Sequence, residues 1–386
     1  MKVLLISTYS GTSGANHALC NLAKSLVEDY FFDVLVLTSR YGPLTEMLES
    51  MKLPYLTMRY YPWVKESGHD SLLEKVKTTI KRLINRINEL KLKQVIKKYN
   101  FDVIHINAST NSFGARVAIK KNIRLVWHIR EFLEEGLSKE FYDPQLAQRL
   151  IKHSDCILSI SKVLSDTLYQ ELQTSNIITV YDGVETSKYI GNPHIILEQN
   201  PLVLTIVGRL VPNKGQIDAI KAVQEVLQRG YNCILNIVGE EGDQDYIDYL
   251  IDYVFKNGLQ NTVRFLGYKK NVSNIWLKTD IALVCSKSEA FGLVTVEAMC
   301  AGALVIGTNN SATVELLNNG EFGILYSYGN YSELRDRIIY SINNADESKN
   351  IAKKARVYAL NNFTLQKHVR NIVTIYQKIC SNDNKC

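Results

Sequence analysis

Two glutamates, Glu289 and Glu297, flank a mainly apolar segment in which a loop around Gly292 gives way to the helical pattern "VTVEAMCAG". A carboxylate is a natural bidentate acceptor for two vicinal hydroxyls, such as those of a ribose. The backbone N–H groups at the beginning of a helix can hold an anion or a sugar hydroxyl. The pair therefore marks a candidate site for a hydroxylated anion. The alternative is that each glutamate is an ordinary exposed helix former.

A second set of polar residues follows the apolar run "LVLTIVG", in the loop "GRLVPNKG". Gly208 lets the chain turn at the end of the expected strand, and Arg209 and Lys214 then project from the same loop. Ligands of α/β sheets bind at the carboxyl ends of strands, and a planar guanidinium beside a compact ammonium suits a pyrophosphate. The alternative is a turn with two solvated cations.

The loop after the first apolar run, "STYSGTSGANHAL", carries Gly11, Gly14 and small hydroxyls before a helical pattern. It can face a phosphate, but it is not GxGxxG. The second strand ends in Ser39 and Arg40 instead of the acid that binds a ribose in NAD enzymes. A nicotinamide dehydrogenase is therefore disfavoured, and Arg40 keeps an NADP-dependent oxidoreductase open as an alternative.

Short β-branched runs that alternate with helical patterns must position these loops, and they occur in two series, one in each half of the chain. Continuous apolar strands of this kind indicate parallel sheets that helices cover on both faces. A chain of 386 residues also exceeds the ~250–300 residues at which a single core stops growing. We therefore predict an α/β protein of two doubly wound domains, joined near the polar stretch Ser187–Pro201.

The composition narrows the class of protein. The chain is 46% hydrophobic and 22% charged, with a formal net charge of +6, which is typical of a soluble globular protein and not of a dedicated nucleic-acid binder. Its seven cysteines are scattered without a CxxC pair, which argues against a zinc site or a disulfide framework and for a reducing cytosol. The opening "MKVLLISTYSG" is interpreted as a strand, too short for a signal peptide, and no apolar run approaches the ~18 residues of a membrane span.

The segment Leu72–Tyr99 differs from the other helical patterns in its charge. Residues 74–98 hold nine Lys and Arg against two acids. Apolar residues recur within the segment at helical spacing: Val76, Ile80, Leu83, Ile84, Ile87 and Leu90. A basic amphipathic helix beside exposed aromatics, here expected in "YYPWVK" (Tyr60–Lys65), can lie on an anionic bilayer. The alternative is a helix that docks its apolar face on the sheet and solvates its basic face.

With these motifs in this order, the chain resembles the family 4 retaining glycosyltransferases of the GT-B fold. The resemblance implies two Rossmann-like domains that face a cleft. Residues 1–190 would bind the acceptor, residues 191–363 would bind a nucleotide sugar, and a helix within 364–386 would pack back on the first domain. The motifs that carry the resemblance are the N-terminal glycine loop, "HIRE" (His128–Glu131), "VYDGVETSKY" (Val180–Tyr189), "GRLVPNKG", "FLGY" (Phe265–Tyr268), the glutamate pair and "NNSATVELL" (Asn309–Leu317).

The resemblance also assigns roles to single residues. In the family the first glutamate lies by the donor sugar and the second binds the ribose diol, so Glu289 and Glu297 would take these roles. The expected donor-binding residues are Gly14, Gly208, Arg209, Lys214, Leu266, Gly267, Glu289, Ala290, Phe291, Gly292, Leu293 and Glu297. Two departures from the family pattern concern phosphate and sugar contacts: the first loop lacks a double glycine, and "NNSATVE" replaces a glycine-rich loop.

The expected catalytic residues are His128, Glu289, Arg209 and Lys214. The histidine would face the donor sugar, and the two cations would neutralise the leaving diphosphate, so no metal and no other cofactor is expected. The DxD match in "GDQD" (Gly242–Asp245) is interpreted as a solvated turn. Arg130 and Glu131 would orient His128 or touch the acceptor.

The sequence thus predicts a cytoplasmic enzyme, peripheral at the inner face of the membrane through residues 72–99. It would move a hexose with retention from a nucleotide diphosphate, UDP by family frequency, to a lipid-linked saccharide in surface polysaccharide or glycan assembly. The alternatives are a transferase of the same fold with a soluble or protein acceptor, the NADP-dependent oxidoreductase, and a non-catalytic partner subunit. The intact set of two cations and two glutamates argues against the last.

Overall fold

The computed structural model describes residues 1–11, 13–68, 71–191 and 196–381. The chain forms two compact units: Met1–Gly183 together with helix α15 (Leu365–Ser381), and Val184–Thr364. The first division lies at 183/184, whereas the sequence analysis placed it at 190/191. The reason is that η1 (Thr186–Tyr189) packs on α11 (Leu293–Ala301) of the second unit. Thr12, the linker residues 192–195 and residues 382–386 of the expected last helix lie outside the described residues.

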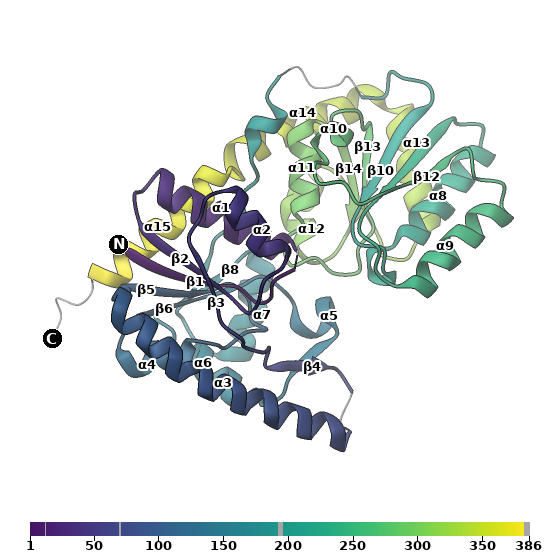
Figure 1. Cartoon of the computed structure of the whole chain (residues 1–386). Helices are drawn as coiled ribbons and strands as arrows, with labels where there is room; N and C mark the ends of the chain where they lie inside the picture. The colour runs from purple at the N-terminus through teal and green to yellow at the C-terminus, as the bar shows by residue number, and fades with distance from the viewer. Residues whose placement is uncertain (12, 69–70, 192–195, 382–386) are drawn as a thin grey trace. The chain divides into compact units, whose positions relative to one another are not determined.

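The first unit contains a parallel sheet of seven strands in the order β3-β2-β1-β5-β6-β8-β9 (Figure 1). A separate antiparallel ladder joins β4 (Val64–Glu66) to β7 (Lys139–Phe141). The sheet strands are β1 (Lys2–Ile6), β2 (Asp33–Thr38), β3 (Tyr55–Thr57), β5 (Val103–Ile106), β6 (Arg124–Ile129), β8 (Cys156–Ser159) and β9 (Ile177–Thr179).

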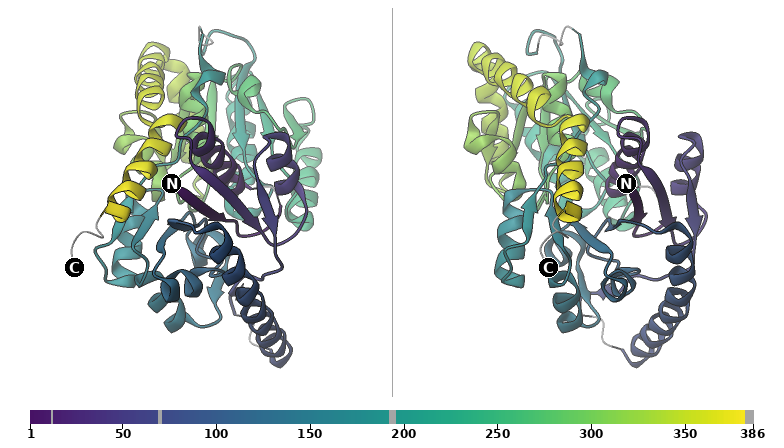
Figure 2. Two further views of the ribbon diagram at one scale, coloured as in Figure 1. Left: turned by 60° about the vertical axis from the view of Figure 1, so that its left-hand side comes forward. Right: turned by 90° about the vertical axis from the view of Figure 1, so that its left-hand side faces the viewer.

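Helices cover both faces of this sheet, as its continuous apolar strands require. On one face α1 and α15 lie side by side and share a core with the strands, and α3 and α4 lie on the other face (Figures 1 and 2). The helices of the unit besides α15 are α1 (Gly14–Glu28), α2 (Pro43–Ser50), α3 (Leu72–Tyr99), α4 (Ala115–Lys121), α5 (Leu133–Leu137), α6 (Pro144–Lys152) and α7 (Lys162–Leu172).

The second unit contains a parallel sheet of six strands in the order β12-β11-β10-β13-β14-β15, so the predicted doubly wound α/β architecture is confirmed in both units. Its strands are β10 (Leu202–Val207), β11 (Cys233–Val238), β12 (Val263–Gly267), β13 (Ile281–Val284), β14 (Leu304–Thr308) and β15 (Ile324–Tyr326). Its helices are η1, η2 (Pro212–Lys214), α8 (Gln216–Gln228), α9 (Gln244–Lys256), α10 (Ser273–Trp276), α11, α12 (Ser311–Leu316), η3 (Asn318–Gly320), α13 (Tyr331–Asn343) and α14 (Ala345–Asn362).

The chain passes between the units at two places, and each is tied to its neighbourhood by hydrogen bonds. In the second unit Val184 forms a parallel bridge with Thr364, and the Val184 N–H donates to the Phe363 carbonyl at 2.9 Å. In the first unit Nδ1 of His368 lies 2.8 Å from the Tyr181 carbonyl oxygen. The two chain segments that connect the units therefore lie next to each other, although they are far apart in sequence.

Helix α3 turns its apolar stripe away from the protein, which contradicts the alternative in which that stripe docks on the sheet. Its inward side buries Leu92 and Ile96 near the C-terminal end and makes polar contacts farther back. Asn88 donates to the Arg59 carbonyl at 2.7 Å, and Asn85 donates to the Tyr61 carbonyl at 2.9 Å. The N-terminal half of the helix projects past the sheet (Figure 2). The exposed apolar residues, each between 51% and 60% accessible, are Val76, Ile80, Leu83, Ile87 and Leu90.

The expectation of exposed aromatics in Tyr60–Lys65 is wrong for two of the three rings. Tyr60 stacks on Phe113 and donates from its hydroxyl to the Ser7 carbonyl at 2.7 Å. Trp63 stacks on Trp127. Both rings are buried, and each donates a hydrogen bond to a backbone carbonyl that follows a strand: Trp63 to Ser109 and Tyr60 to Ser7. Among the described residues, no helix combines the length and the hydropathy that crossing a bilayer requires.

Candidate active site

Three glycines bring neighbouring strand ends of the second unit close together. Gly208 follows β10, Gly239 follows β11, and Gly267 ends β12. A Cβ atom at Gly239 would lie only 1.9 Å from the Gly208 carbonyl oxygen, so any side chain there would push the two turns apart. The sequence analysis singled out Gly208 and Gly267 but missed Gly239, although it follows its strand as Gly208 does.

The structure brings the side chains of Lys214 and Glu289 together, as expected of two residues in one site. The Lys214 ammonium lies 2.5 Å from Oε1 of Glu289, and the Ser286 hydroxyl donates to the same oxygen at 2.6 Å. The two side chains are 29% and 13% exposed, so the pair is open to solvent on one side. Sequence reasoning missed Ser286, whose signal was a hydroxyl directly after an apolar strand.

Gly215 allows the two loops to meet. Its φ of +68° lies in the left-handed region, and a Cβ atom would lie 2.3 Å from the Cys285 carbonyl oxygen. The Lys287 N–H also donates to the Asn213 carbonyl at 2.8 Å. The loop after β10 therefore lies against the end of β13, which positions Lys214 beside Glu289.

Helix α11 begins beside this ion pair. Its N-cap Gly292 has a φ of +97°, a conformation that glycine adopts without strain. Phe291 is buried and packs edge-on against Phe363 at a centroid distance of 5.8 Å, which fixes the loop that holds Ala290. This anchored loop leads directly into α11, so it also fixes the position of the backbone N–H groups in the first turn, which begins at Leu293.

Glu297 lies one turn inside α11, closer to its beginning than the two turns expected from the sequence. The Trp276 indole N–H on α10 donates to Oε2 of Glu297 at 3.4 Å. Burial raises the pKa of this carboxyl to about 7, against smaller lowering effects of Trp276 and the Lys188 charge. Trp276, which the sequence analysis did not select, thus orients this partly buried carboxylate.

The remaining predicted donor residues lie at the same edge of the sheet. Arg209 is exposed in the loop after β10, and Leu266 precedes Gly267 at the end of β12. In the DxD match, Asp243 accepts the Tyr246 N–H at 3.1 Å as the N-cap of α9. No group of three or more His, Cys, Asp or Glu suited to a metal ion occurs among the described residues.

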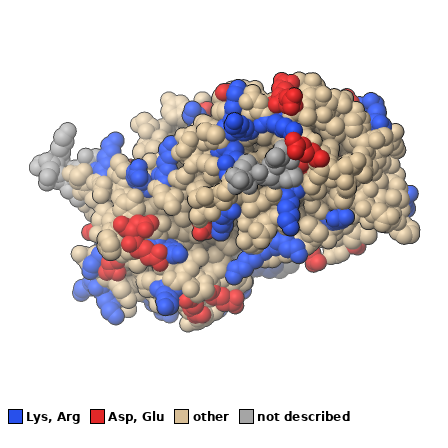
Figure 3. Space-filling model, turned by 90° about the horizontal axis from the view of Figure 1, so that it is seen from above, with Lys and Arg blue, Asp and Glu red and all other residues tan. Residues whose placement is uncertain are grey.

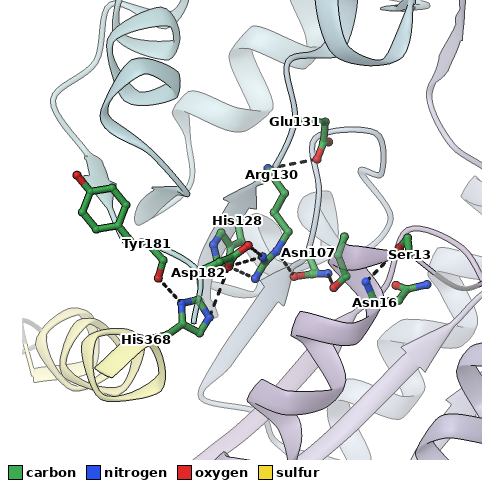
Figure 4. A network of polar contacts seen from close by, with 10 residues as sticks. Ser13, Asn16, Asn107, His128, Arg130, Glu131, Tyr181, Asp182 and His368 are labelled. Atoms are coloured by element: carbon green, nitrogen blue, oxygen red, sulfur yellow. Dashed lines mark hydrogen bonds and ion pairs between the residues drawn. The ribbon is translucent and has the colours of Figure 1, made fainter. Parts of the chain in front are cut away.

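In the first unit, a buried ion pair lies at the carboxyl end of β6 (Figure 4). Nη1 of Arg130 donates to both carboxylate oxygens of Asp182, at 2.5 and 2.7 Å, and Nε donates to Oδ1 of Asn107 at 2.8 Å. The side chains of the pair are 3% and 5% exposed. Asp182 was missed, although it stands in the "YDG" turn after an apolar run.

This network continues to the first loop of the chain. Nδ2 of Asn107 donates to the Ala15 carbonyl at 2.9 Å, and Nδ2 of Asn16 donates to the carbonyls of Tyr9 and Gly11 at 3.0 and 2.7 Å. Ser13 caps α1 by accepting the Asn16 N–H (Figure 4). The predicted phosphate-facing Gly14 begins this helix and is exposed.

The His128 ring is fully buried within the first unit. Its centroid lies 5.2 Å from that of His105 and 5.9 Å from that of His368 on α15. Burial, and then the Arg130 charge, hold its pKa well below the usual value, so the ring is neutral. In the structure it contacts other groups of the first unit, and a contact with a sugar stays a prediction.

Glu131 is fixed by three hydrogen bonds. Its Oε1 accepts the N–H and the hydroxyl of Ser109 at 2.7 and 2.6 Å, and its Oε2 accepts the Arg130 N–H at 3.2 Å. Burial raises the pKa of this carboxyl, against the lowering effect of these donors. It lines a cavity within the first unit.

Two family models match the chain over nearly the whole of both units. The model described as Glycosyltransferase Family 4 matches residues 12–188, and the model described as Glycosyl transferases group 1 matches residues 193–358. The chain belongs to the family 4 glycosyltransferases. It is therefore an enzyme that transfers a glycosyl group, which sets aside the oxidoreductase and the non-catalytic subunit.

Relatives and solved structures agree with this family. The N-acetyl-alpha-D-glucosaminyl L-malate synthase of Bacillus anthracis is 23% identical over 76% of this chain and 79% of its own. The UDP-Gal:alpha-D-GlcNAc-diphosphoundecaprenol alpha-1,3-galactosyltransferase of Escherichia coli is 22% identical over 89% of both. Anabaena HepE, solved in complex with UDP, superposes with a TM-score of 0.81 over 98% of this chain and 100% of its own, at 22% identity. The GT-B fold expected from the sequence is thus confirmed.

Proposed function

We propose that this glycosyltransferase moves a hexose from a UDP-sugar, with retention of anomeric configuration, to a lipid-linked saccharide. The observation that carries the proposal is the Lys214–Glu289 ion pair at the strand ends, with the partly buried Glu297 one turn into the adjoining helix. Glu289, Lys214 and Glu297 would then bind the sugar, the diphosphate and the ribose, which follow one another in this order along a nucleotide sugar. The UDP complex of HepE supports the choice of base.

The donor diphosphate would take the Lys214 ammonium and the exposed Arg209 guanidinium. Glu289, released from Lys214 but still held by Ser286, would then accept hydroxyls of the sugar. Charge that develops on the leaving diphosphate would be stabilised by the two cations, an effect of about 3 kcal/mol for one such group. We propose no metal and no other cofactor, because these side chains supply the neutralising charge.

The proposed reaction breaks the bond between the anomeric carbon and the diphosphate oxygen and forms a bond from the same face of the sugar to an acceptor oxygen. A short-lived oxocarbenium ion separates the two events, and a donor phosphate oxygen takes the acceptor proton. The buried network around Arg130 would hold the first loop, with Gly14, in place for the diphosphate. His128 and Glu131 would reach the sugar and the acceptor from the end of β6.

The test is a transfer assay with UDP-glucose, UDP-galactose and UDP-N-acetylglucosamine, in the presence of EDTA. We expect one of these donors to release UDP and to give an α-linked product from an α-linked donor. Glu297→Ala should weaken UDP binding by about 1–3 kcal/mol, the value of hydrogen bonds to a charged group. Release of UDP that requires a divalent ion, or unchanged UDP affinity in the variant, would contradict the assigned roles.

The acceptor and the membrane are proposed from α3 and from the E. coli relative, whose name gives a diphosphoundecaprenol-linked acceptor. The exposed apolar stripe of α3 lies between Lys and Arg side chains of the same helix, the pattern of a helix that lies on an anionic bilayer. On the face shown in Figure 3, Lys and Arg are mixed with Asp and Glu. Residues 74–98 of α3, by contrast, hold nine Lys and Arg against two acids.

Flotation with vesicles of phosphatidylglycerol and phosphatidylcholine tests this surface. Leu83→Gln together with Ile87→Gln should reduce binding about tenfold or more, because each buried CH₂ contributes about 0.8 kcal/mol. A control with Tyr249→Gln and Phe255→Gln, two exposed apolar residues of α9, should bind as the native chain does. Equal binding of the stripe variant and the native chain would remove the membrane from the proposal.

A second candidate is a soluble acceptor, favoured by the B. anthracis relative, whose name gives L-malate as the acceptor. Transfer to water-soluble acceptors that proceeds equally with and without vesicles, and is unaffected by the α3 variant, would favour it.

A further inference from the structure

A cavity of about 560 Å³ lies within the first unit, beside the end of β6. This is the size of a site for a small ligand, and the carboxyl end of a parallel strand is where α/β sheets bind ligands. Helices α5, α6 and α7 and strand β7 supply most of its walls. Much of the wall is apolar: Ile129, Phe132, Phe141, Leu164 and Leu168.

The charged side chains around this cavity are mostly acidic. Five glutamates and one lysine, Lys139, line it. Glu140 pairs with Lys65 at 3.0 Å, and Glu131 is held by Ser109. Glu134, Glu135 and Glu171 contribute the remaining negative charge, and all three are exposed to solvent.

Local structure explains two of these three glutamates but not the third. Glu134 and Glu135 lie in the first turn of α5, where the helix dipole stabilises a carboxylate. Glu171 lies in the last turn of α7, where the same dipole disfavours a negative charge. Partial burial raises the pKa of Glu171, and the charges of Glu134 and Glu135 raise it further.

An acid held in such a place is electrostatically unfavourable for the free protein. Residues that break a local rule without a structural gain concentrate at functional sites. A bound cation would relieve the repulsion among the three glutamates, and the apolar walls would bind a hydrocarbon group beside it. A phosphate or carboxylate would be repelled.

We propose that this cavity binds the part of the acceptor that carries a protonated amine on an apolar group. That the ligand is part of the acceptor rests on the proposed function. That the ligand carries an amine on an apolar group rests on the cavity alone. If the acceptor also contains a diphosphate, that group must lie outside this cavity.

The first test uses three probes with the same hydrocarbon chain: hexylammonium, hexanol and hexanoate. Calorimetric titration of the full chain at low salt should give binding of hexylammonium about tenfold tighter than hexanol, and weakest binding of hexanoate. The preference for the cation should fall as salt is added. Equal affinities for the cation and the alcohol, or no binding of any probe, would overturn the proposal.

The second test removes the charges but keeps the shape, with Glu134→Gln, Glu135→Gln and Glu171→Gln combined. Hexylammonium should bind five- to tenfold more weakly, while hexanol binds as before, which shows that the cavity is still folded. A control with Glu28→Gln, Glu46→Gln and Asp245→Asn makes the same change in net charge at exposed positions and should retain the preference. An unchanged affinity for hexylammonium in the first variant would contradict the site.

The third test separates the site from the reaction. Hexylammonium should raise the KM for the acceptor and leave the affinity for UDP unchanged. Binding without competition would overturn its assignment to the acceptor. Binding in a chain that transfers no sugar from any nucleotide sugar would support the cavity and place the failure in the proposed function.

Discussion

The two units each place an ion pair at the carboxyl ends of their strands, and the two pairs differ in exposure. Arg130 and Asp182 in the first unit are 3% and 5% exposed, whereas Lys214 and Glu289 in the second are 29% and 13% exposed. A buried pair is stable only when its remaining hydrogen bonds are made, and Arg130 makes one to Asn107. We therefore interpret the buried Arg130–Asp182 pair as structural and the partly exposed Lys214–Glu289 pair as accessible to a ligand.

The largest effect should come from breaking the buried pair. Arg130→Met leaves the Asp182 carboxylate without its partner in the interior, so we expect a loss of about 3–5 kcal/mol in the free energy of unfolding. Chemical denaturation measures this loss. A loss below about 1 kcal/mol would mean that the two pairs are energetically alike, and the comparison would fail.

The open pair should show the opposite balance between stability and activity. Lys214→Ala should lower kcat by about 10²–10³, the range for removal of one group that stabilises developing charge. The free energy of unfolding should change by less than about 1 kcal/mol, as for other partly exposed ion pairs. Transfer kinetics and denaturation of the same preparation test both parts. A variant that is destabilised but fully active would reverse the roles.

Acid should affect the two units in opposite directions between pH 7 and pH 5. Burial lowers the pKa of His105 to about 3 and also lowers the pKa values of His128 and His368. Because these pKa values lie below those of the unfolded chain, the stability they contribute is present above pH 6.5 and is lost as the pH falls. For His105 the loss at pH 5 is about 2 kcal/mol.

Glu297 has the opposite sign, since burial raises its pKa to about 7. Its folded-state pKa lies above the unfolded value, so the stability it contributes is present at low pH and is lost as the pH rises through 7. Hydrogen exchange, corrected for the intrinsic effect of pH, should show weaker protection of β6 and α15 at pH 5 and stronger protection of α11. If protection changed in the same direction in β6, α15 and α11, the pH dependence of local stability would not come mainly from these histidines and Glu297.

The smallest effect should appear in UDP binding. The ionised form of Glu297 accepts the ribose hydroxyls, so affinity for UDP should rise about fivefold to tenfold between pH 6 and pH 8, because the carboxylate is mostly protonated at the lower pH. Titration calorimetry in matched buffers measures the slope. Glu297→Gln is the control and should flatten it; a slope that persists in this variant belongs to another group.

The sequence allowed the repeated parallel sheets, the glycine turn at Gly208 and the location of Lys214 and Glu289 after strand ends to be predicted, because each depends on residues next to a strand end. The Arg130–Asp182 pair was not predicted, since its members are 52 residues apart in the chain and meet only through the order of the strands. The burial of His128 likewise depends on α15, which covers it from a distant part of the chain.

Helix α3 illustrates a different limit. The spacing of its apolar residues predicted a stripe, but periodicity does not say which side of a helix faces the protein. The side of the helix that faces the protein is set in part by Asn85 and Asn88, which donate hydrogen bonds to the backbone of residues 59–61. Two asparagines within a charged helix gave no sequence signal for that choice.

The two passages between the units have a consequence for the order of synthesis. The second unit is one continuous segment, Val184–Thr364, whereas the first needs α15, whose Val369, Ile372, Val373 and Tyr376 complete its core. Domains fold as units while the ribosome extends the chain. The second unit, although later in sequence, can therefore finish folding first. The first unit must wait for residues 365–381, because until they emerge α1 covers that face of the sheet without its neighbour α15.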